Sequence, residues 1–314
     1  MGRFLFRISV FILATLGLLK VIELAVSDQL RASEEYYYAD FERAHNGELK
    51  SDIVVLGSSR AFVHYDPAII EDSTSLSCYN LAIDGGCQSM QFAIWKNLIL
   101  NNELPKVVVQ NVEYLSFGKR KTLFEKERYL PYLHESYFFE PLSLIDTKLW
   151  QDRYIPMYRY HGQWKLIKDA IGAFLDHAPR NPYDLYKGHK YKNQDFTGEE
   201  KINNFPLDAS DFKLGKTLLS ELLNDCKLND VDLVLCYSPE FDNGANAPNH
   251  QVNDIVAFYT EVASQHEHVV FWDMRNMDLR ADKKFFADNY HLNEQGAKLF
   301  SKEFSGRLRQ HLNR

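Results

Sequence analysis

The stretch DIVVLGSSR at residues 52–60 decides the fold of this 314-residue chain. Its apolar part is rich in β-branched side chains and ends at Gly57, a pattern typical of a short strand buried on both faces. A glycine at the carboxyl end of a parallel strand permits a tight turn, and hydroxyl groups beyond it lie at the edge where open α/β sheets bind ligands. We therefore expect Ser58 and Ser59 at the functional edge of a sheet.

Similar apolar runs recur along the chain. We expect strands at residues 79–83, 106–109, 231–236 and 269–272, and helices at residues 89–100, 214–224 and 253–265. Strands that alternate with helices favour a parallel sheet with helices on both faces. The sequence therefore predicts an α/β domain at residues 51–314, preceded by a polar spacer at residues 28–50.

A long segment at about residues 116–210 interrupts this alternation. It is rich in aromatic residues, namely Tyr129, Tyr132, Tyr137, Phe138, Phe139, Trp150, Tyr154, Tyr158, Tyr160 and Trp164. We interpret it as a largely helical insertion that forms a lid or one wall of a site. The alternative is that these rings only form the core of an inserted subdomain.

Residues 1–27 predict a transmembrane signal anchor. Arg3 and Arg7 precede an apolar run that, continued to Val26, spans roughly 28 Å as a helix and matches the hydrocarbon layer. Positive charge ahead of the run places the N-terminus in the cytoplasm. The anchor is then expected in the inner membrane and the rest of the chain on its periplasmic or extracytoplasmic side. The alternative is a cleaved signal peptide, for which residues 25–27 are a tolerable site.

The composition excludes several classes of protein. Lysine and arginine number 36 against 43 acidic residues, a net charge of −7, so no nucleic-acid partner is expected. The mean hydropathy of −0.37 excludes a multi-span membrane protein. The cysteines match no zinc spacing, and no phosphate loop or dinucleotide motif is present, so we expect neither a metal nor a cofactor. The four cysteines are expected to be buried thiols, with a Cys78–Cys87 bridge as the alternative.

A second element lies near the other end of the chain. A serine hydroxyl is a weak nucleophile unless a base takes its proton and a carboxylate orients that base. Asp288 and His291 stand three residues apart in front of the last helical pattern. In a turn, this spacing lets the carboxylate hold the imidazole while the other ring nitrogen faces the serine. The pattern predicts Ser59, His291 and Asp288 as a split triad; the alternative is a helix cap or surface loop.

Three further residues are candidates around that triad. Gly85 ends a second predicted strand, where a glycine brings a backbone N–H close to a developing oxyanion; the alternative is an ordinary Asp-Gly turn. Arg60 can offer guanidinium N–H groups to an oxyanion or a carboxylate, or it forms a structural ion pair. His64 either faces the cleft or is a buried side chain with its hydrogen bonds satisfied.

These elements together resemble the SGNH/GDSL hydrolase superfamily over about residues 52–114 and 231–310. The resemblance implies a flavodoxin-like, three-layer SGNH hydrolase fold with a serine nucleophile, and Ser58 stands where that family has aspartate. Asn80 starts the second block and places its oxyanion glycine. The positions that correspond to the family's blocks are Gly57, Ser58, Ser59, Gly85, Asp288 and His291, and Ser58 is the one that departs from the pattern.

The third block of the family, Gly-x-Asn-Asp, has no counterpart. The corresponding strand end reads QNVEY at residues 110–114, where Asn111 comes too early and Tyr114 stands at the expected place. With this loss and its N-terminal anchor, the chain looks more like a divergent, membrane-anchored branch of the superfamily. That branch includes accessory proteins of teichoic-acid alanylation and exopolysaccharide acetylation. The resemblance therefore implies acyl transfer or ester hydrolysis on envelope glycans.

The leading hypothesis is a membrane-anchored serine esterase or O-acyltransferase that acts on ester-linked acyl groups of envelope glycans. Ser58, Arg60 and Gly85 would then face the oxyanion or the substrate. The partners implied are an acylated carbohydrate or another ester, the membrane, and an envelope polysaccharide machinery. Two alternatives remain: a non-catalytic glycan-binding or assembly scaffold that retains the fold, and a lipid or peptidoglycan esterase.

Overall fold

The computed structural model describes residues 1–33, 36–114, 122–175, 185–197, 209–242 and 249–313. The chain divides into two compact units. The helical unit comprises residues 1–43 and 121–182, and the sheet unit comprises residues 44–120 and 183–314.

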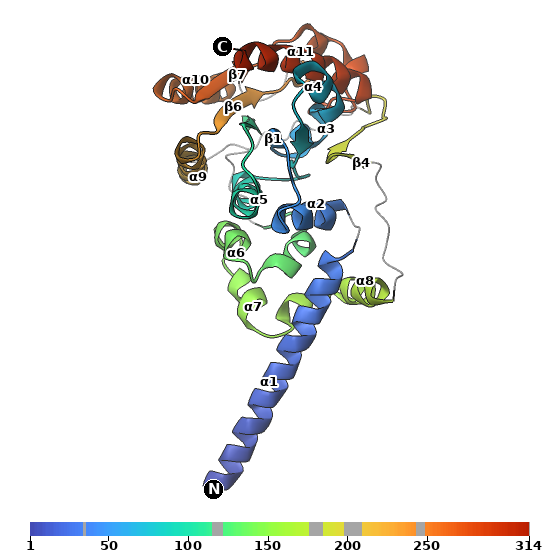
Figure 1. Ribbon diagram of the computed structural model, residues 1–314, viewed down its shortest axis with the longest axis vertical. Coiled ribbons are helices and arrows are strands. Elements are labelled where there is room, and N and C mark those ends of the chain that lie inside the picture. The colour runs from blue at the N-terminus through green and yellow to red at the C-terminus, as the bar shows by residue number, and fades with distance from the viewer. Residues whose placement is uncertain (34–35, 115–121, 176–184, 198–208, 243–248, 314) are drawn as a thin grey trace. The chain divides into compact units, whose positions relative to one another are not determined.

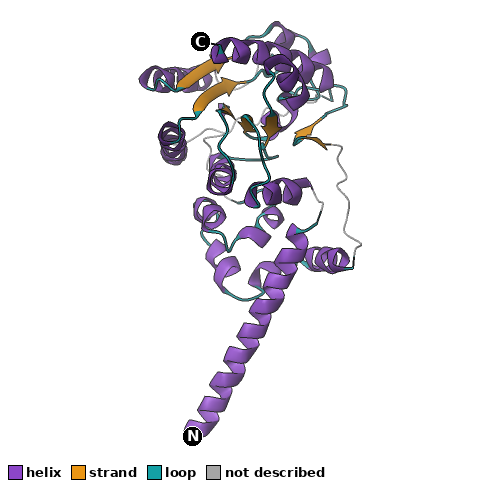
Figure 2. Ribbon diagram, viewed as in Figure 1, coloured by secondary structure: helices purple, strands orange, loops and turns teal. Residues whose placement is uncertain are grey.

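The sheet unit is built on five parallel strands in the order β2-β1-β3-β6-β7 (Figures 1 and 2). The strands are β1 (Ile53–Leu56), β2 (Cys78–Asn80), β3 (Val107–Asn111), β6 (Asp232–Tyr237) and β7 (Val269–Asp273). Every residue of β1 is buried, as the unbroken apolar run predicts, because β1 lies between two neighbouring strands and under helices. The predicted α/β class with a parallel sheet is thereby confirmed.

Helices cover both faces of this sheet. One group is α3 (Ser59–His64), α4 (Pro67–Thr74) and α11 (Glu294–Leu312), and the other is α5 (Gln88–Asn101), α9 (Ala209–Leu228) and α10 (Asn249–Gln265). Helix α11 packs on α3 and α4, whereas α5 packs on α9. Figure 1 shows α11 above the strands and α5 and α9 below them. The result is the three-layer arrangement typical of doubly wound sheets.

Smaller elements complete the sheet unit. The 3₁₀ turns η5 (Asp278–Ala281) and η6 (Lys283–Phe285) precede α11, and β4 (Leu185–Tyr186) and β5 (His189–Lys190) form an antiparallel hairpin. Beyond β2 the chain keeps following β1, because Leu81 N donates to Val55 O and Ile83 N donates to Gly57 O. All four cysteines are buried and none forms a disulfide bond, so the alternative Cys78–Cys87 bridge does not form.

The helical unit begins with α1 (Gly2–Arg31), which is long and apolar enough by length and composition to cross a membrane. The unit continues with η2 (Lys126–Arg128), η3 (Leu130–Tyr132), α6 (Ser136–Ser143), α7 (Leu149–Tyr154), η4 (Tyr158–Tyr160) and α8 (Trp164–Phe174). Helix α2 (Tyr36–His45) begins in this unit and ends in the sheet unit. The α1 helix extends past the anchor boundary expected at residue 27.

An aromatic cluster forms the core of the helical unit. The ring of Phe41 lies 5.5 Å from that of Phe138 and 5.7 Å from that of Tyr132, and Tyr129 stacks on Phe41 at 6.0 Å. All four rings are buried. Several aromatic residues of the predicted insertion thus pack with one another. Residues 176–184 and 198–208 of that insertion lie outside the described residues.

The turn after β1 has no room for a side chain at its glycine. A Cβ at Gly57 would lie 2.4 Å from the Cβ of Ala61 and 3.0 Å from that of Asn111. We expect Gly57→Ala to lower the free energy of unfolding by about 1–3 kcal/mol, because the turn must shift. Urea unfolding of the full chain in detergent, followed by tryptophan fluorescence, measures this loss.

The matched control is Gly306→Ala on α11, where an added Cβ meets nothing within 4 Å. This variant is expected to be at least as stable as the wild type, because alanine favours a helix more than glycine does. Equal losses in the two variants would contradict the steric explanation.

Candidate active site

Ser59 stands at the carboxyl end of the central strand β1. The strand ends at Leu56, and Ser58 caps α3 through its side-chain oxygen, which accepts a hydrogen bond from Arg60 N. Ser59 is the first residue of that helix. The chain connects β1 through α3 and α4 to β2 on one side, whereas β3 pairs with β1 on the other side. Open α/β sheets bind ligands at such a reversal of strand order.

Asp288 and His291 lie in the turn before α11. Nδ1 of His291 is 2.8 Å from one carboxylate oxygen of Asp288 and 2.9 Å from the other. Nε2 of the same ring is 2.8 Å from Oγ of Ser59. The structure thus brings the three predicted residues together in the order hydroxyl, imidazole and carboxylate, across 232 positions of sequence.

Backbone hydrogen bonds fix the shape of this turn. The N–H groups of Tyr290 and His291 each donate to Asp288 Oδ1 at 3.0 Å. Ala287 N donates to His291 O at 2.9 Å and closes the turn. Asn293 then caps α11 by accepting a hydrogen bond from the backbone N–H three residues later. The spacing of three residues holds the Asp288 carboxylate against the His291 ring because the backbone between them is locked.

Lys192 is a neighbour of Asp288 that the sequence analysis missed. Its Nζ lies 2.7 Å from Asp288 Oδ2, and its carbonyl oxygen accepts a hydrogen bond from Glu294 N. Burial would raise the pKa of the Asp288 carboxyl, but the hydrogen bonds and charges of His291 and Lys192 hold that pKa well below its usual range. Asp288 therefore stays ionised. No local motif marks Lys192, which is 96 residues away in sequence.

His64 is buried beside the site and is not exposed to the cleft. Its Nε2 accepts a hydrogen bond from Leu292 N at 3.0 Å, so the proton resides on Nδ1, which lies 3.0 Å from Ser238 Oγ. Burial and the positive charge of Arg60 hold the pKa of His64 well below its ordinary value. His64 is thus a neutral support for the backbone next to His291.

Ser58 and Arg60 belong to a buried polar network. The Ser58 hydroxyl donates to Glu113, and the Arg60 guanidinium donates to Glu240 and to the carbonyl oxygen of Ser238. Arg60 is only 2% exposed. Glu113 lies just beyond the C-terminal end of β3. The ion pair predicted as the alternative for Arg60 therefore forms. Neither Ser58 nor Arg60 lines the cavity at Ser59, and a role of the two side chains at the substrate stays a prediction.

A cavity of about 290 Å³ opens at Ser59 and His291. Phe62 and Val63 of α3 line one wall, and residues 190–194 line another. The full lining is Ser59, Phe62, Val63, Asp84, Lys190, Tyr191, Lys192, Asn193, Gln194 and His291. A late part of the predicted insertion, residues 190–194, therefore forms a wall of this cavity.

The glycine turn after β2 reaches the rim of the same cavity through Asp84. Gly85 itself has a φ of 65°, in the left-handed region that favours glycine, and Gly86 N donates to Ile83 O. Asn80 fixes the start of this turn, because its side chain donates to Ala61 O and accepts from Ala82 N. The role predicted for Gly85 as an oxyanion donor stays a prediction.

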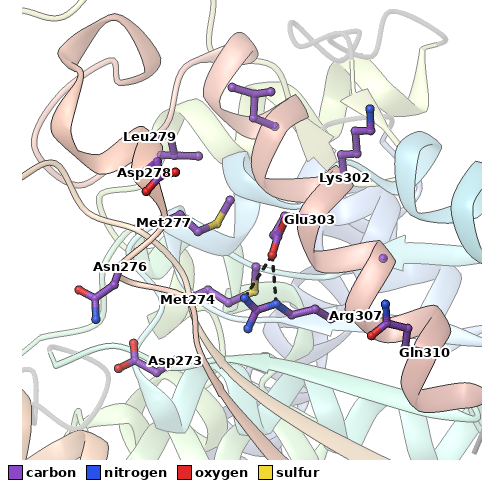
Figure 3. Close-up of a pocket in the computed structure, with 12 residues that line it drawn as sticks. Asp273, Met274, Asn276, Met277, Asp278, Leu279, Lys302, Glu303, Arg307 and Gln310 are labelled. Carbon is purple, nitrogen blue, oxygen red and sulfur yellow. Dashed lines mark hydrogen bonds and ion pairs between the residues drawn. The ribbon is translucent and has the colours of Figure 1, made fainter.

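A larger cavity, of about 710 Å³, lies elsewhere in the sheet unit, between the η5 segment and α11 (Figure 3). Met274, Met277 and Leu279 give it apolar walls, and Arg307 pairs with Glu303 at 3.1 Å on α11. None of the predicted site residues lines it. Among the described residues, no group of three or more His, Cys, Asp or Glu side chains is placed to hold a metal ion.

Two solved structures are similar to this chain. A Bacteroides fragilis protein named as a candidate acylhydrolase is 10% identical, with a TM-score of 0.42 over 83% of this chain and 88% of its own. A Streptococcus pneumoniae protein named as a candidate platelet activating factor is 13% identical, with a TM-score of 0.44 over 94% and 99%. No family model and no curated protein matches the chain.

The buried neutral His64 predicts a pH dependence of stability. Its pKa is lower in the folded than in the unfolded chain, so only the unfolded chain binds this proton as the pH falls below about 6.5. We expect this group to remove up to about 2 kcal/mol of stability between pH 6.5 and 5. His64→Gln keeps an acceptor and a donor but cannot titrate. The free energy of unfolding of this variant, measured by urea at pH 6.5 and at pH 5, should fall less between the two pH values than that of the wild type. An equal loss in both proteins would contradict the explanation through His64.

Proposed function

We propose that the chain is a serine esterase or O-acyltransferase of the SGNH type, with Ser59 as its nucleophile. The observation that carries the proposal is the hydrogen-bonded line from Ser59 Oγ through His291 to Asp288, with 2.8 Å at each step. A hydroxyl, a base and an orienting carboxylate in this order are the minimum that acyl transfer through a serine requires. The cavity at this serine gives an ester access to it.

The reaction proceeds in two steps. Ser59 Oγ attacks the ester carbonyl carbon while His291 Nε2 takes the hydroxyl proton, and collapse of the tetrahedral intermediate breaks the ester C–O bond. His291 returns the proton to the leaving alkoxide. In the second step, water or a sugar hydroxyl gives its proton to His291 and attacks the acyl-enzyme, which frees Ser59. Asp288 orients the ring and stabilises its charged form.

Backbone N–H groups supply the oxyanion site in this proposal. The N–H of Ser59 lies in the first turn of α3, where helix N–H groups have no acceptor within the helix. The N–H of Gly85 belongs to the turn whose residue Asp84 lines the cavity. Donors aimed at the developing negative charge lower the barrier to acyl transfer. Arg60 and Ser58 support this region through Glu113.

The proposal places the enzyme on a membrane, with an envelope glycan ester as substrate. Helix α1 supplies the span, and Arg3 and Arg7 at its start favour an N-terminus in the cytoplasm and a sheet unit outside it. The cavity of about 290 Å³ suits a short acyl group. Tyr191, Asn193 and Gln194 along its wall offer a ring face and amide groups, which suit a sugar.

Ser59→Ala tests the nucleophile. We expect hydrolysis of a short-chain aryl acetate to fall roughly 10³-fold or more and fluorophosphonate labelling to disappear, because the variant lacks the hydroxyl that is bonded to Nε2 of His291. The rate and the label are measured on the full chain in detergent, with circular dichroism as the check on the fold. Ser58→Ala is the control and should still be labelled.

Labelling that survives in Ser59→Ala but not in Ser58→Ala would move the nucleophile to the neighbouring serine. A wild type that neither hydrolyses the acetate nor takes the label would favour the non-catalytic scaffold instead.

Lys192→Met tests the cation beside Asp288. Without it the pKa of Asp288 rises and the protonated imidazole is favoured, so the ascending limb of the pH–rate profile should move to higher pH. Because the pair is partly exposed, we expect a loss in kcat/KM of only a few-fold, about 1 kcal/mol or less in the barrier. Lys192→Arg should restore the profile. Lys298→Met, which breaks a solvent-exposed pair with Glu294 on α11, should leave it unchanged; a shift there of equal size would contradict the specific role.

A further inference from the structure

Helix α1 changes its surroundings along its length. Residues 1–18 are exposed on every side, although most of them are apolar. From Leu19 onward the helix packs into the helical unit, and Glu23, Ser27 and Leu30 are fully buried there. The exposed section spans roughly 25 Å at the rise of an α-helix, close to the thickness of a hydrocarbon layer. The helix therefore leaves the membrane at about residue 19 if it spans one.

The contacts of Glu23 show which part of the helical unit lies next to the point where the exposed section of α1 ends. Its carboxylate accepts a hydrogen bond from Met157 N at 2.6 Å and pairs with Arg159 at 3.3 Å and with Lys20 at 2.5 Å. The segment between α7 and η4 is thereby tied to α1 within about one helical turn of the exposed section. Three apolar or aromatic side chains of this segment are exposed: Tyr154, Ile155 and Tyr158.

Helix α8 follows directly and packs on α1. Figure 1 shows α8 beside the C-terminal part of α1. The buried side of α8 consists of Leu166 and Ala170. A second apolar stripe, which we call the outer stripe, consists of Trp164, Ile167, Ile171 and Phe174, at the spacing of one helix face. Its Trp164 is 71% exposed and its Phe174 is 72% exposed.

Polar residues border the outer stripe on one flank, whereas on the other flank it adjoins the buried Leu166 and Ala170. Lys165 and Lys168 are exposed along one border of the stripe, and Asp169 pairs with Lys165 at 2.6 Å. A helix with an apolar face, tryptophan on that face and lysines at its border has the composition of helices that lie in the membrane interface. Tryptophan and tyrosine favour the same depth, because one end of each ring system is apolar and the other is polar.

We propose that α8 is an interfacial helix, whose outer stripe is buried in the headgroup region of the membrane that α1 spans. The proposal rests on the membrane anchor of the proposed function and adds a second point of attachment. We expect lipid to cover the outer stripe, because the exposed apolar section of α1 extends from the same helical unit. That section ends about one helical turn from the residues of α1 that contact the segment of Tyr158. The helical unit is then fixed on the membrane surface by a span and by α8 lying along the surface.

Tryptophan fluorescence in brominated lipid tests this inference. Helix α1 contains no tryptophan, and the four tryptophans of the chain are Trp95, Trp150, Trp164 and Trp272. The full chain is reconstituted in vesicles of dibrominated phosphatidylcholine with some phosphatidylglycerol, and in unbrominated vesicles for reference. We expect bromine to quench the wild type, Trp164→Phe to lose most of this quenching, and Trp272→Phe in the sheet unit to keep it.

A second variant addresses the stripe without touching the fluorophore. Ile171→Lys combined with Phe174→Lys changes only exposed side chains and leaves Leu166 and Ala170 in place, so the fold should persist. We expect it to float with vesicles as the wild type does, through α1, but to lose the quenching of Trp164. Flotation that fails for the wild type would overturn the membrane anchor itself. Flotation without quenching of Trp164 would overturn the interfacial helix alone, and a dimer that forms under those conditions would identify a second copy as the occupant.

Discussion

The hydrogen bond from Leu292 N to Nε2 of His64 joins the two halves of the candidate site. His64 is the last residue of α3, whose first residue is Ser59, and Leu292 directly follows His291. One short helix therefore carries the hydroxyl at one end and holds the backbone of its base at the other. Ser301 of α11 donates to His64 O at 2.9 Å and accepts from Asp66 N, which extends the same junction along α11. The distance from Ser59 to His291 depends on this junction because the two residues share no strand.

A second constraint acts at the carboxyl ends of three neighbouring strands. Ser58 follows β1, Glu113 follows β3 and Ser238 follows β6, and Arg60 connects the last two. A buried guanidinium is costly unless it is paired, and here Glu240 pairs with it while the Tyr237 ring lies 5.2 Å away. This network occupies the carboxyl ends of β1, β3 and β6. Glu113 therefore fixes the positions of the Ser58 and Arg60 side chains.

The sequence predicts the elements of the sheet unit well, because apolar runs such as residues 53–56 and the glycine after them are local signals. It also predicts the pair Asp288 and His291, whose geometry follows from a spacing of three in a turn. The sequence does not predict whether a polar side chain faces the substrate or is buried in a network. Arg60 and Ser58 have the chemistry of a substrate-binding site, but their hydrogen-bond partners lie up to 180 residues away in the sequence. Lys192 was missed for the same reason, since its contact with Asp288 depends on how the chain returns to the sheet.

The predicted insertion illustrates the same limit at a larger scale. Its aromatic residues form one compositional block, yet residues 122–175 belong to the helical unit and residues 185–197 to the sheet unit. Composition identifies such a block but does not indicate where the chain crosses from one core to another. Rings cluster in the helical unit because helices such as α6 and α7 are short, and large flat side chains bury the most apolar area per residue.

The C-terminal half of α1 is part of that core. This packing is relevant to whether the N-terminal segment is cleaved. Cleavage at residues 25–27 would remove Glu23, and with it the partner of Arg159, whose side chain is fully buried. It would also disturb the hydrogen bond between Ser27 and the Tyr160 hydroxyl. A buried charge without its partner destabilises a fold by several kcal/mol, on the order of 3–5. The contacts of α1 therefore favour retention of the whole helix, because its C-terminal half completes the helical unit.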